Sequence, residues 1–459
     1  MSTTSTKTGS RPNILFMIAD DHRYQTVHSN GDPVVQTPVL DALARRGVSF
    51  QGTYIHGGCS PAVCVPSRAA VNTGVSPFRA HVPTGSDESV PRHSKVKAGR
   101  IRPDLALMGE TFRQAGYATF ATGKWHNDRD SFHRSFADAR NVFFGGMCDH
   151  DKVPVQDYDP AGGYGAEREH IASGDSSVLF ADSAIAFLQS RRETDPPFLL
   201  YTAFTAPHDP RTPPPEYRAM YDPAALPLPP NFAPRHPFDN GELEIRDELL
   251  AAFPREPAEV RRHLAEYYGM VSHLDHQVGR MLAALEKSGQ ADNTIVVYVA
   301  DHGIGLGQHG LLGKQNLYDH SIRVPMIMAG PGVPADRRPE ALVYSHDLFP
   351  TLCELTGVGV PATVESRSLR PVWSGESPGR ESMFTAYQDL QRMVRRGEWK
   401  LIEYTVPGRP LRRQLFDVAN DPWETRDLVN DPAHTARVAA MAAELEQARV
   451  HFGAPAPAN

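Results

Sequence analysis

The chain has 459 residues, of which 40% are hydrophobic and 22% are charged. This balance is typical of a globular protein with a sizeable core, and it excludes disorder of the whole chain. Lys and Arg number 47 against 54 Asp and Glu, which gives a formal net charge of −7. A mildly acidic chain without basic runs argues against nucleic acid or an anionic membrane as the main partner.

The sequence shows no targeting or membrane segment. Its longest apolar runs, such as 14–19 and 295–300, are far too short to span a bilayer, and the first ten residues lack an apolar signal region. Four cysteines are too few for a disulfide framework. We therefore expect a reduced, cytoplasmic protein. The sequence leaves the oligomeric state open, a homo-oligomer included.

Four apolar runs predict buried strands, and each leads directly into polar residues. They are 12–19 before Asp20-Asp21, 117–122 before Gly123-Lys124-Trp125-His126, 197–206 before Pro207-His208, and 294–300 before Asp301-His302. Helical patterns over 103–114, 178–191 and 258–287 lie between them. This alternation predicts an α/β fold: a large mixed, mostly parallel sheet sandwiched by helices. Such sheets bind ligands beyond the carboxyl ends of their strands, where these polar residues lie.

The composition changes after about residue 365. Segments 383–386, 393–396, 399–404 and 413–416 read as short antiparallel strands, and 431–450 has a helical pattern. We predict a catalytic α/β domain over 1–365 and a C-terminal α+β subdomain over 366–459, with a small antiparallel sheet and a terminal helix. Eleven prolines in 205–240 predict a long loop near His208.

Two groups of residues suggest chemistry. Carboxylates and an imidazole at Asp20, Asp21, Asp301 and His302 could chelate a divalent cation, although single Asp residues more often form caps and turns. In Cys64-Val65-Pro66-Ser67-Arg68, Pro66 suits the first turn of a helix, so Cys64 would lie just before a positively polarised N-terminus. Cys64 could then be a thiolate nucleophile, or an inert buried cysteine as expected for Cys59, Cys148 and Cys353.

The Cys-x-Pro-Ser-Arg segment, with Thr73-Gly74 after it, resembles the signature of type I sulfatases of the alkaline phosphatase superfamily. The resemblance covers nearly the whole chain. Further segments in the family's order are 123–126, 206–208, 300–303, 313–314, 346–351, 415–417 and 421–424.

The resemblance implies a site and a reaction. Cys64 would be oxidised to Cα-formylglycine by a separate formylglycine-generating enzyme, and the aldehyde hydrate would attack sulfur. Asp20, Asp21, Cys64, Asp301 and His302 would bind one divalent metal, with Ca²⁺ expected first and Mg²⁺ or Mn²⁺ as alternatives. The implied catalytic residues are Cys64, Arg68, Lys124, His126, His208 and Lys314. Of these, Lys124, His208 and Lys314 would bind sulfate.

The implied function is hydrolysis of an organic sulfate monoester of an aryl, alkyl or sugar alcohol, with a small molecule or a saccharide as substrate. A first alternative is a phosphonate monoester hydrolase or phosphodiesterase of the same superfamily. Those enzymes lack the full Asp-Asp pair and the Lys/His set found at Asp20-Asp21 and Lys124/His126. A second alternative is a binding protein whose Cys64 is never modified.

Some features depart from the pattern or could mislead. Val75 stands where the family often has Arg, and Arg79 could replace it. A Gly-x-Gly-x-x-Gly match at 305–310 follows a strand, but no clean helix or acidic residue follows it, so we reject a dinucleotide site. His309 could contact substrate, but we expect a structural role. The polar, Gly-rich segment 145–150 could line the substrate mouth, but we expect an ordinary loop. Specificity would come from loops 76–100, 145–170 and 205–250, whose shapes the sequence does not show.

Overall fold

The computed structural model describes residues 11–82 and 99–457. Its main sheet has seven strands, and the inner ones are parallel, as predicted. In spatial order the strands are β2 (Gly47–Ser49), β11 (Met326–Ala329), β10 (Thr294–Ala300), β1 (Asn13–Ala19), β9 (Phe198–Ala203), β5 (Ala118–Lys124) and β6 (Asp138–Phe143). At one edge, β11 runs antiparallel to β10, and β2 runs antiparallel to β11, so the sheet is mixed.

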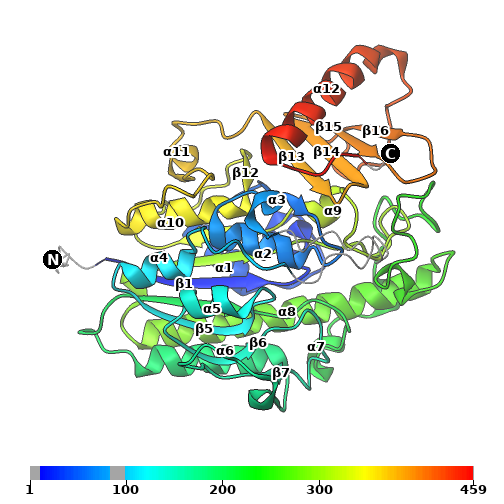
Figure 1. Ribbon diagram of the computed structural model, residues 1–459. Helices are drawn as coiled ribbons and strands as arrows, with labels where there is room; N and C mark the ends of the chain where they lie inside the picture. The colour runs from blue at the N-terminus through cyan, green and yellow to red at the C-terminus, as the bar shows by residue number, and fades with distance from the viewer. Residues whose placement is uncertain (1–10, 83–98, 458–459) are drawn as a thin grey trace, which may run out of the picture.

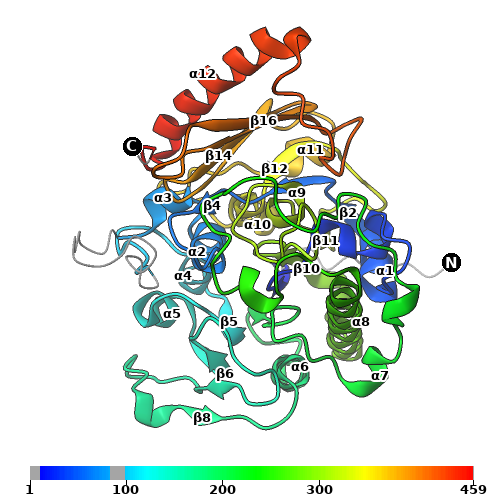
Figure 2. The ribbon, with the colours of Figure 1, turned by 90° about the vertical axis from the view of Figure 1, so that its right-hand side faces the viewer.

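Helices cover both faces of this sheet (Figures 1 and 2). The side chains of β1 alternate: Leu15 and Met17 belong to one apolar cluster, and Ile14 and Phe16 to the other. Helices α1 (Pro38–Arg46), α6 (Ser176–Ser190) and α8 (Pro257–Lys287) contribute to the first cluster. Helices α2 (Cys64–Thr73), α4 (Met108–Gln114), α5 (Arg129–Ser135) and α10 (Leu348–Thr356) contribute to the second. The sheet is therefore buried on both sides, which explains its continuous apolar strands.

The helix predicted over 103–114 begins later, at Met108. Residues 102–105 form a turn in which the Leu105 N–H donates to the Arg102 carbonyl at 3.2 Å. Leu107 then has an extended backbone, with φ −109° and ψ 146°, so helical hydrogen bonds cannot propagate back through it.

The remaining elements are short or lie in the C-terminal part. The short ones are β3 (Gly52–Tyr54), β12 (Leu342–Tyr344), β7 (Pro154–Val155), β8 (His170–Ile171), α3 (Pro77–Ala80), α7 (Pro215–Arg218), α9 (Asp319–Ile322) and α11 (Arg370–Trp373). None of the helices in the described ranges is both long and apolar enough to cross a bilayer.

A second sheet forms the C-terminal part, beneath helix α12 (Thr435–Phe452) (Figure 1). Its antiparallel strands are β13 (Ser382–Tyr387), β14 (Gln391–Arg396), β15 (Trp399–Tyr404) and β16 (Arg412–Asp417). The sequence did not predict its fifth strand, β4 (Gly57–Gly58), which pairs with β13 from far back in the chain. A Cβ on Gly58 would lie 2.2 Å from Pro66 Cγ, so β4 approaches the start of α2 as only glycine allows.

A buried ion cluster joins the C-terminal sheet to the catalytic part of the chain. Lys400 of β15 is fully buried, and its Nζ lies 2.7 Å from Asp319 Oδ1 and 2.6 Å from Glu424 Oε1. Asp319 begins helix α9 and also accepts a hydrogen bond from Tyr54 Oη at 2.8 Å. The two parts are therefore coupled by charge as well as by β4.

Replacing Lys400 by methionine is expected to lower the free energy of unfolding by about 3–5 kcal/mol, because Asp319 and Glu424 would remain buried without this cation. Urea denaturation measures the change. Arg409→Met is the control: its pair with Asp239 is exposed (side chains 63% and 39% accessible), so its loss should cost less than about 1 kcal/mol. Equal unfolding midpoints for Lys400→Met and the unaltered protein would contradict the expectation.

Candidate active site

The predicted site residues meet at one edge of the main sheet. Strands β10, β1, β9 and β5 are neighbours in that order, and the polar residues that follow them lie together. Asp20 and Asp21 follow β1, His208 follows β9, and Asp301 and His302 follow β10. Lys124 is the last residue of β5, and His126 comes two residues later. All these residues are buried, together with Cys64 and Arg68 of α2 and with Lys314.

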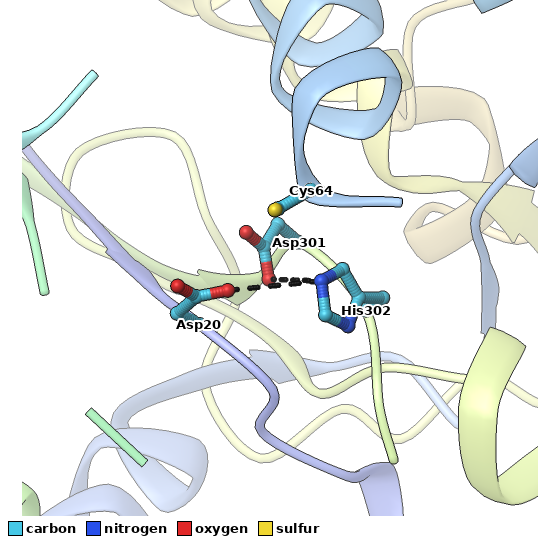
Figure 3. Close-up of side chains that lie close together, drawn as sticks. All are labelled: Asp20, Cys64, Asp301 and His302. Atoms are coloured by element: carbon cyan, nitrogen blue, oxygen red, sulfur yellow. Dashed lines mark ion pairs between the residues drawn. The ribbon is translucent and has the colours of Figure 1, made fainter. Parts of the chain in front are cut away.

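Three acids and a histidine form the centre of the site. His302 Nε2 lies 3.7 Å from Asp20 Oδ1 and 3.6 Å from Asp301 Oδ1, and His302 Nδ1 lies 3.1 Å from Asp21 Oδ1. Ligand atoms of Asp20, Cys64, Asp301 and His302 lie within 4.8 Å of one another. Figure 3 shows the thiol and the carboxylates converging from separate segments.

The donor set of this cluster fits a divalent cation. Asp20 Oδ1, Asp21 Oδ2 and His302 Nε2 are buried and have no hydrogen-bond partner among the described residues. Buried polar atoms normally have a partner, so three such atoms in neighbouring residues of the acid cluster indicate a site for a ligand. His302 Nδ1 lies 2.9 Å from the Gly303 carbonyl and can donate to it, which leaves Nε2 free as a ligand.

Three cations surround the acids. Arg68 Nε lies 2.8 Å from Asp301 Oδ2, and its Nη1 donates to the Lys124 carbonyl at 2.6 Å. Lys124 Nζ pairs with Asp20 Oδ2, and Lys314 Nζ lies 3.0 Å from Asp21 Oδ1. Burial raises the pKa of Asp301 to about 6, with Asp20 adding to the shift. Burial would also raise the pKa of Asp20, but Lys124, His208 and Arg68 hold it well below its usual range.

Cys64 is the first residue of α2, not the residue before it, and only 1% of its surface is exposed. The expectation that Cys64 lies just before the helix is therefore wrong by one residue, and the start of α2 is buried. Its Sγ lies 3.1 Å from His126 Nδ1 and 3.7 Å from Lys124 Nζ. Burial would raise the pKa of the thiol, but His126, Lys124 and Lys314 outweigh burial and place the pKa well below its ordinary value.

His208 and Lys314 form a pair next to Asp21. Lys314 Nζ lies 2.9 Å from His208 Nε2, so this nitrogen accepts and the proton resides on Nδ1. His208 Nδ1 can donate to the Asp209 carbonyl at 2.7 Å. A basic pair next to Asp21 is suited to an anionic group.

The structure adds residues that the sequence did not predict. The segment 145–150, expected to be an ordinary loop, contacts the site: the Gly146 carbonyl accepts from Lys124 Nζ at 2.6 Å. A Cβ on Gly146 would lie 2.6 Å from His126 Nε2, so a side chain there would displace the histidine. His150 Nε2 can donate to the His208 carbonyl at 2.8 Å. The polar, Gly-rich composition of this segment was its signal in the sequence.

Two residues considered in the sequence analysis, Arg79 and His309, lie outside the candidate active site. Arg79 does not replace the missing arginine at Val75, because its Nη2 pairs with Glu365 at 2.6 Å and its side chain is 36% exposed. His309 stacks on Tyr318 at 3.8 Å between ring centroids, the structural role expected for it. Of the loop 76–100 expected to set specificity, residues 83–98 lie outside the described part of the chain.

An acidic residue of the long loop holds the segment that carries Lys314. The Glu248 carboxylate accepts from the backbone N–H of Leu312 and of Gly313, both at 2.8 Å. Arg255 Nη2 lies 2.5 Å from the same carboxylate. Glu248 therefore fixes the backbone just before Lys314 and is a positioning residue.

Glu248→Gln is expected to lower kcat/KM about 10-fold or more, because one amide oxygen cannot replace both carboxylate acceptors and Lys314 would shift. Steady-state kinetics and thermal unfolding are measured together. Glu244→Gln, an exposed position in the same loop, should keep the activity. If Glu248→Gln lowers only the unfolding temperature and leaves kcat/KM unchanged, the positioning role is wrong.

Comparisons with known proteins agree with this arrangement. The family model described as Sulfatase matches residues 12–358, and that of the N-sulphoglucosamine sulphohydrolase C-terminal region matches 307–451. The chain is 27% identical to an N-acetylglucosamine-6-O-sulfatase of Bacteroides thetaiotaomicron over 92% of this chain and 81% of that one.

Solved structures share the fold. A protein in complex with its substrate D-glucosamine-2-N,6-O-disulfate has a TM-score of 0.76 at 23% identity, covering 96% of this chain and 98% of that one. A phosphonate monoester hydrolase of Agrobacterium radiobacter has a TM-score of 0.75 at 22% identity, covering 96% of both chains. The match of the sulfatase model to most of the chain, over the residues that build this site, shows that the protein belongs to the sulfatase family.

Proposed function

We propose that the protein hydrolyses a sulfate monoester of an organic alcohol, with a sulfated saccharide as the first substrate to test. One observation carries the proposal: residue 64 of a Cys-x-Pro-Ser-Arg segment lies 3.1 Å from His126 and 3.7 Å from Lys124, beside the acid cluster. The relatives' names, which include sulfated sugars, support the saccharide class.

Cys64 is proposed to be the precursor of Cα-formylglycine, made by a formylglycine-generating enzyme. The Sγ position then marks where the hydroxyl groups of the hydrated aldehyde lie. A hydrate has two hydroxyl groups: one can attack sulfur, and the other can lose a proton so that sulfate is expelled. A serine has no second hydroxyl and would need water to attack a crowded sulfate.

Asp20, Asp21, Asp301 and His302 are proposed to hold one divalent metal. Their hard oxygen ligands favour Ca²⁺, with Mg²⁺ or Mn²⁺ as alternatives, and the imidazole is compatible with Mn²⁺. A cation bound there supplies positive charge that stabilises anionic oxygens at residue 64 and on sulfate.

The chain's own groups can then carry each step. Lys124, His208 and Lys314 hold the sulfate oxygens, and Arg68 holds residue 64 against Asp301. One hydroxyl of the hydrate releases its proton to water, its oxygen bonds to sulfur, and the bond from sulfur to the ester oxygen breaks. Lys314 protonates the departing alcohol, either directly or through His208 Nε2. His126, next to residue 64, takes the proton of the remaining hydroxyl. The carbon–oxygen bond to sulfate then breaks, which releases sulfate and restores the aldehyde.

The proposal is tested with a panel of aryl, alkyl and sugar sulfates beside a phosphonate monoester, on one metal-loaded preparation. We expect kcat/KM for the best sulfate to exceed that for the phosphonate by about 100-fold or more. Protein produced without the modifying enzyme is the matched control and should release no sulfate. A higher rate on the phosphonate would favour the phosphonate hydrolase. An unmodified thiol at residue 64 after production with the modifying enzyme, together with no sulfate release, would favour a binding protein.

A further inference from the structure

Two buried arginines lie beside the site and take no part in the reaction described above. Arg23 follows Asp21 by two residues, and Arg211 follows His208 by three. Their exposed fractions are 2% and 6%. Burying a guanidinium is costly unless an anion or several acceptors receive its N–H groups.

Neither arginine has an ion-pair partner in the described part of the chain. The Arg23 guanidinium lies 5.6 Å from the centroid of the Tyr267 ring, and Arg211 Nη1 donates to His263 Nδ1 at 3.0 Å. Nε and Nη1 of Arg23, and Nε and Nη2 of Arg211, meet no acceptor among the described residues. Four buried donors from two cations are therefore unused.

The two guanidinium groups contact side chains of the same helix, α8. His263 and Tyr267 are four residues apart in α8, so they lie on one face of the helix, one turn from each other. Tyr267 Oη donates to the Asp21 carbonyl at 2.6 Å. The arginines thus lie along α8 on the side of the site formed by Asp21.

The carboxylates around Arg211 are already engaged by other cations. Asp21, Asp209 and Asp247 act electrostatically on Arg211, yet burial still lowers the pKa of this guanidinium. Asp21 pairs with Lys314 at 3.0 Å, and Arg246 pairs with Asp209 at 2.5 Å and with Asp247 at 2.6 Å. These three carboxylates lie among four cations, the two arginines with Arg246 and Lys314, so the group has one excess positive charge. The forked donors of the two arginines match a carboxylate or a sulfate.

We infer that Arg23 and Arg211 form a second anion-binding subsite, which receives a carboxylate or a second sulfate on the alcohol portion of the substrate. The inference rests on the proposed sulfate ester hydrolysis and narrows its substrate class to esters that carry two anionic groups. The ester sulfate would lie at His208 and Lys314, and the second anion along α8.

The test compares sugars that differ in one group. Glucose sulfates are paired with glucuronate sulfates, and with disulfated glucoses, that share the same reacting sulfate position. In the unaltered protein, kcat/KM should be at least about 10-fold higher for the doubly anionic member of the best pair. In Arg211→Gln and in Arg23→Gln this ratio should fall toward one, whereas Arg280→Gln, a surface position of α8 that pairs with Asp182, should leave it unchanged.

The ratio of the two kcat/KM values separates a subsite from a structural role. A partly unfolded variant would hydrolyse both esters of a pair more slowly by the same factor, and the ratio would not change. An unchanged ratio in both arginine variants, or a preference of the unaltered protein for singly charged esters, would overturn the subsite. A larger ratio for the glucuronate sulfates indicates that the subsite prefers a carboxylate. A larger ratio for the disulfated glucoses indicates that it prefers a sulfate. If no ester is hydrolysed, the proposed function is wrong. Calorimetric titration of the same pairs into the unmodified protein then gives the ratio of their dissociation constants, and that ratio tests the subsite.

Discussion

Replacing Cys64 by alanine is expected to abolish sulfate release, with a loss in kcat of about 10⁴-fold or more, because removal of a nucleophile leaves only binding and electrostatic effects. Alanine has no oxidisable sulfur, so no aldehyde hydrate can form at the point where His126 and Lys124 converge. Initial rates on the best ester of the panel, with peptide mass spectrometry of residue 64, measure the effect.

The fold should survive this substitution. Cys64 is buried, so losing one sulfur atom leaves a small void and costs about 1–2 kcal/mol in the free energy of unfolding. Cys353→Ala is the matched control: Cys353 is buried in α10 within the apolar cluster, where its loss should cost similar stability and no activity. Sulfate release by folded Cys64→Ala protein would show that residue 64 is not the nucleophile.

Removing the divalent metal with a chelator is expected to stop hydrolysis and to lower the unfolding temperature. Asp20 Oδ1 and Asp21 Oδ2 would then be buried without a partner, which destabilises the folded state. A metal that binds only the folded state stabilises it, so adding the metal at about 100 times its dissociation constant should raise the free energy of unfolding by about 2.7 kcal/mol. Differential scanning calorimetry with Ca²⁺, Mg²⁺ and Mn²⁺ in turn measures the shift and ranks the ions.

His302→Ala gives a sharper version of this test. It removes one ligand atom, His302 Nε2, without leaving Arg68, Lys124 or Lys314 unpaired, so the variant should still fold. The metal-dependent rise in unfolding temperature should shrink and the metal concentration needed for half-maximal activity should rise. Asp151→Asn, on the surface, should behave as the unaltered protein does. A full metal response in His302→Ala would exclude His302 as a ligand.

Much of this molecule could be predicted from local patterns. The strand predicted at 294–300 is β10 (Thr294–Ala300), because a run of apolar residues bounded by polar ones defines a strand buried on both faces. The position of Asp20, Asp301 and His302 followed from the same patterns, since parallel strands bring their carboxyl ends together. The helix over 103–114 was too long by five residues, because a turn at Leu105 overrides the periodicity.

Residues with no periodic signal could not be predicted. Gly146, His150 and Glu248 lie in irregular loops, and their roles depend on which backbone groups of distant segments they meet. The same is true of β4, whose two glycines pair with a strand more than three hundred residues later. Such contacts have large sequence separation and no repeating pattern, so nothing local encodes them.

The sequence alone therefore determined the α/β class, the sulfatase motif around Cys64 and the residues at the strand ends, because these depend on hydrophobic periodicity and on residue type in a short segment. Only the tertiary structure decided that Cys64 is buried and that Arg79 lies elsewhere. It also decided that Arg23 and Arg211 contact one face of α8 and have no ion-pair partner among the described residues. The physical reason is that burial and charge pairing are set by neighbours in space, which the order of residues along the chain does not reveal.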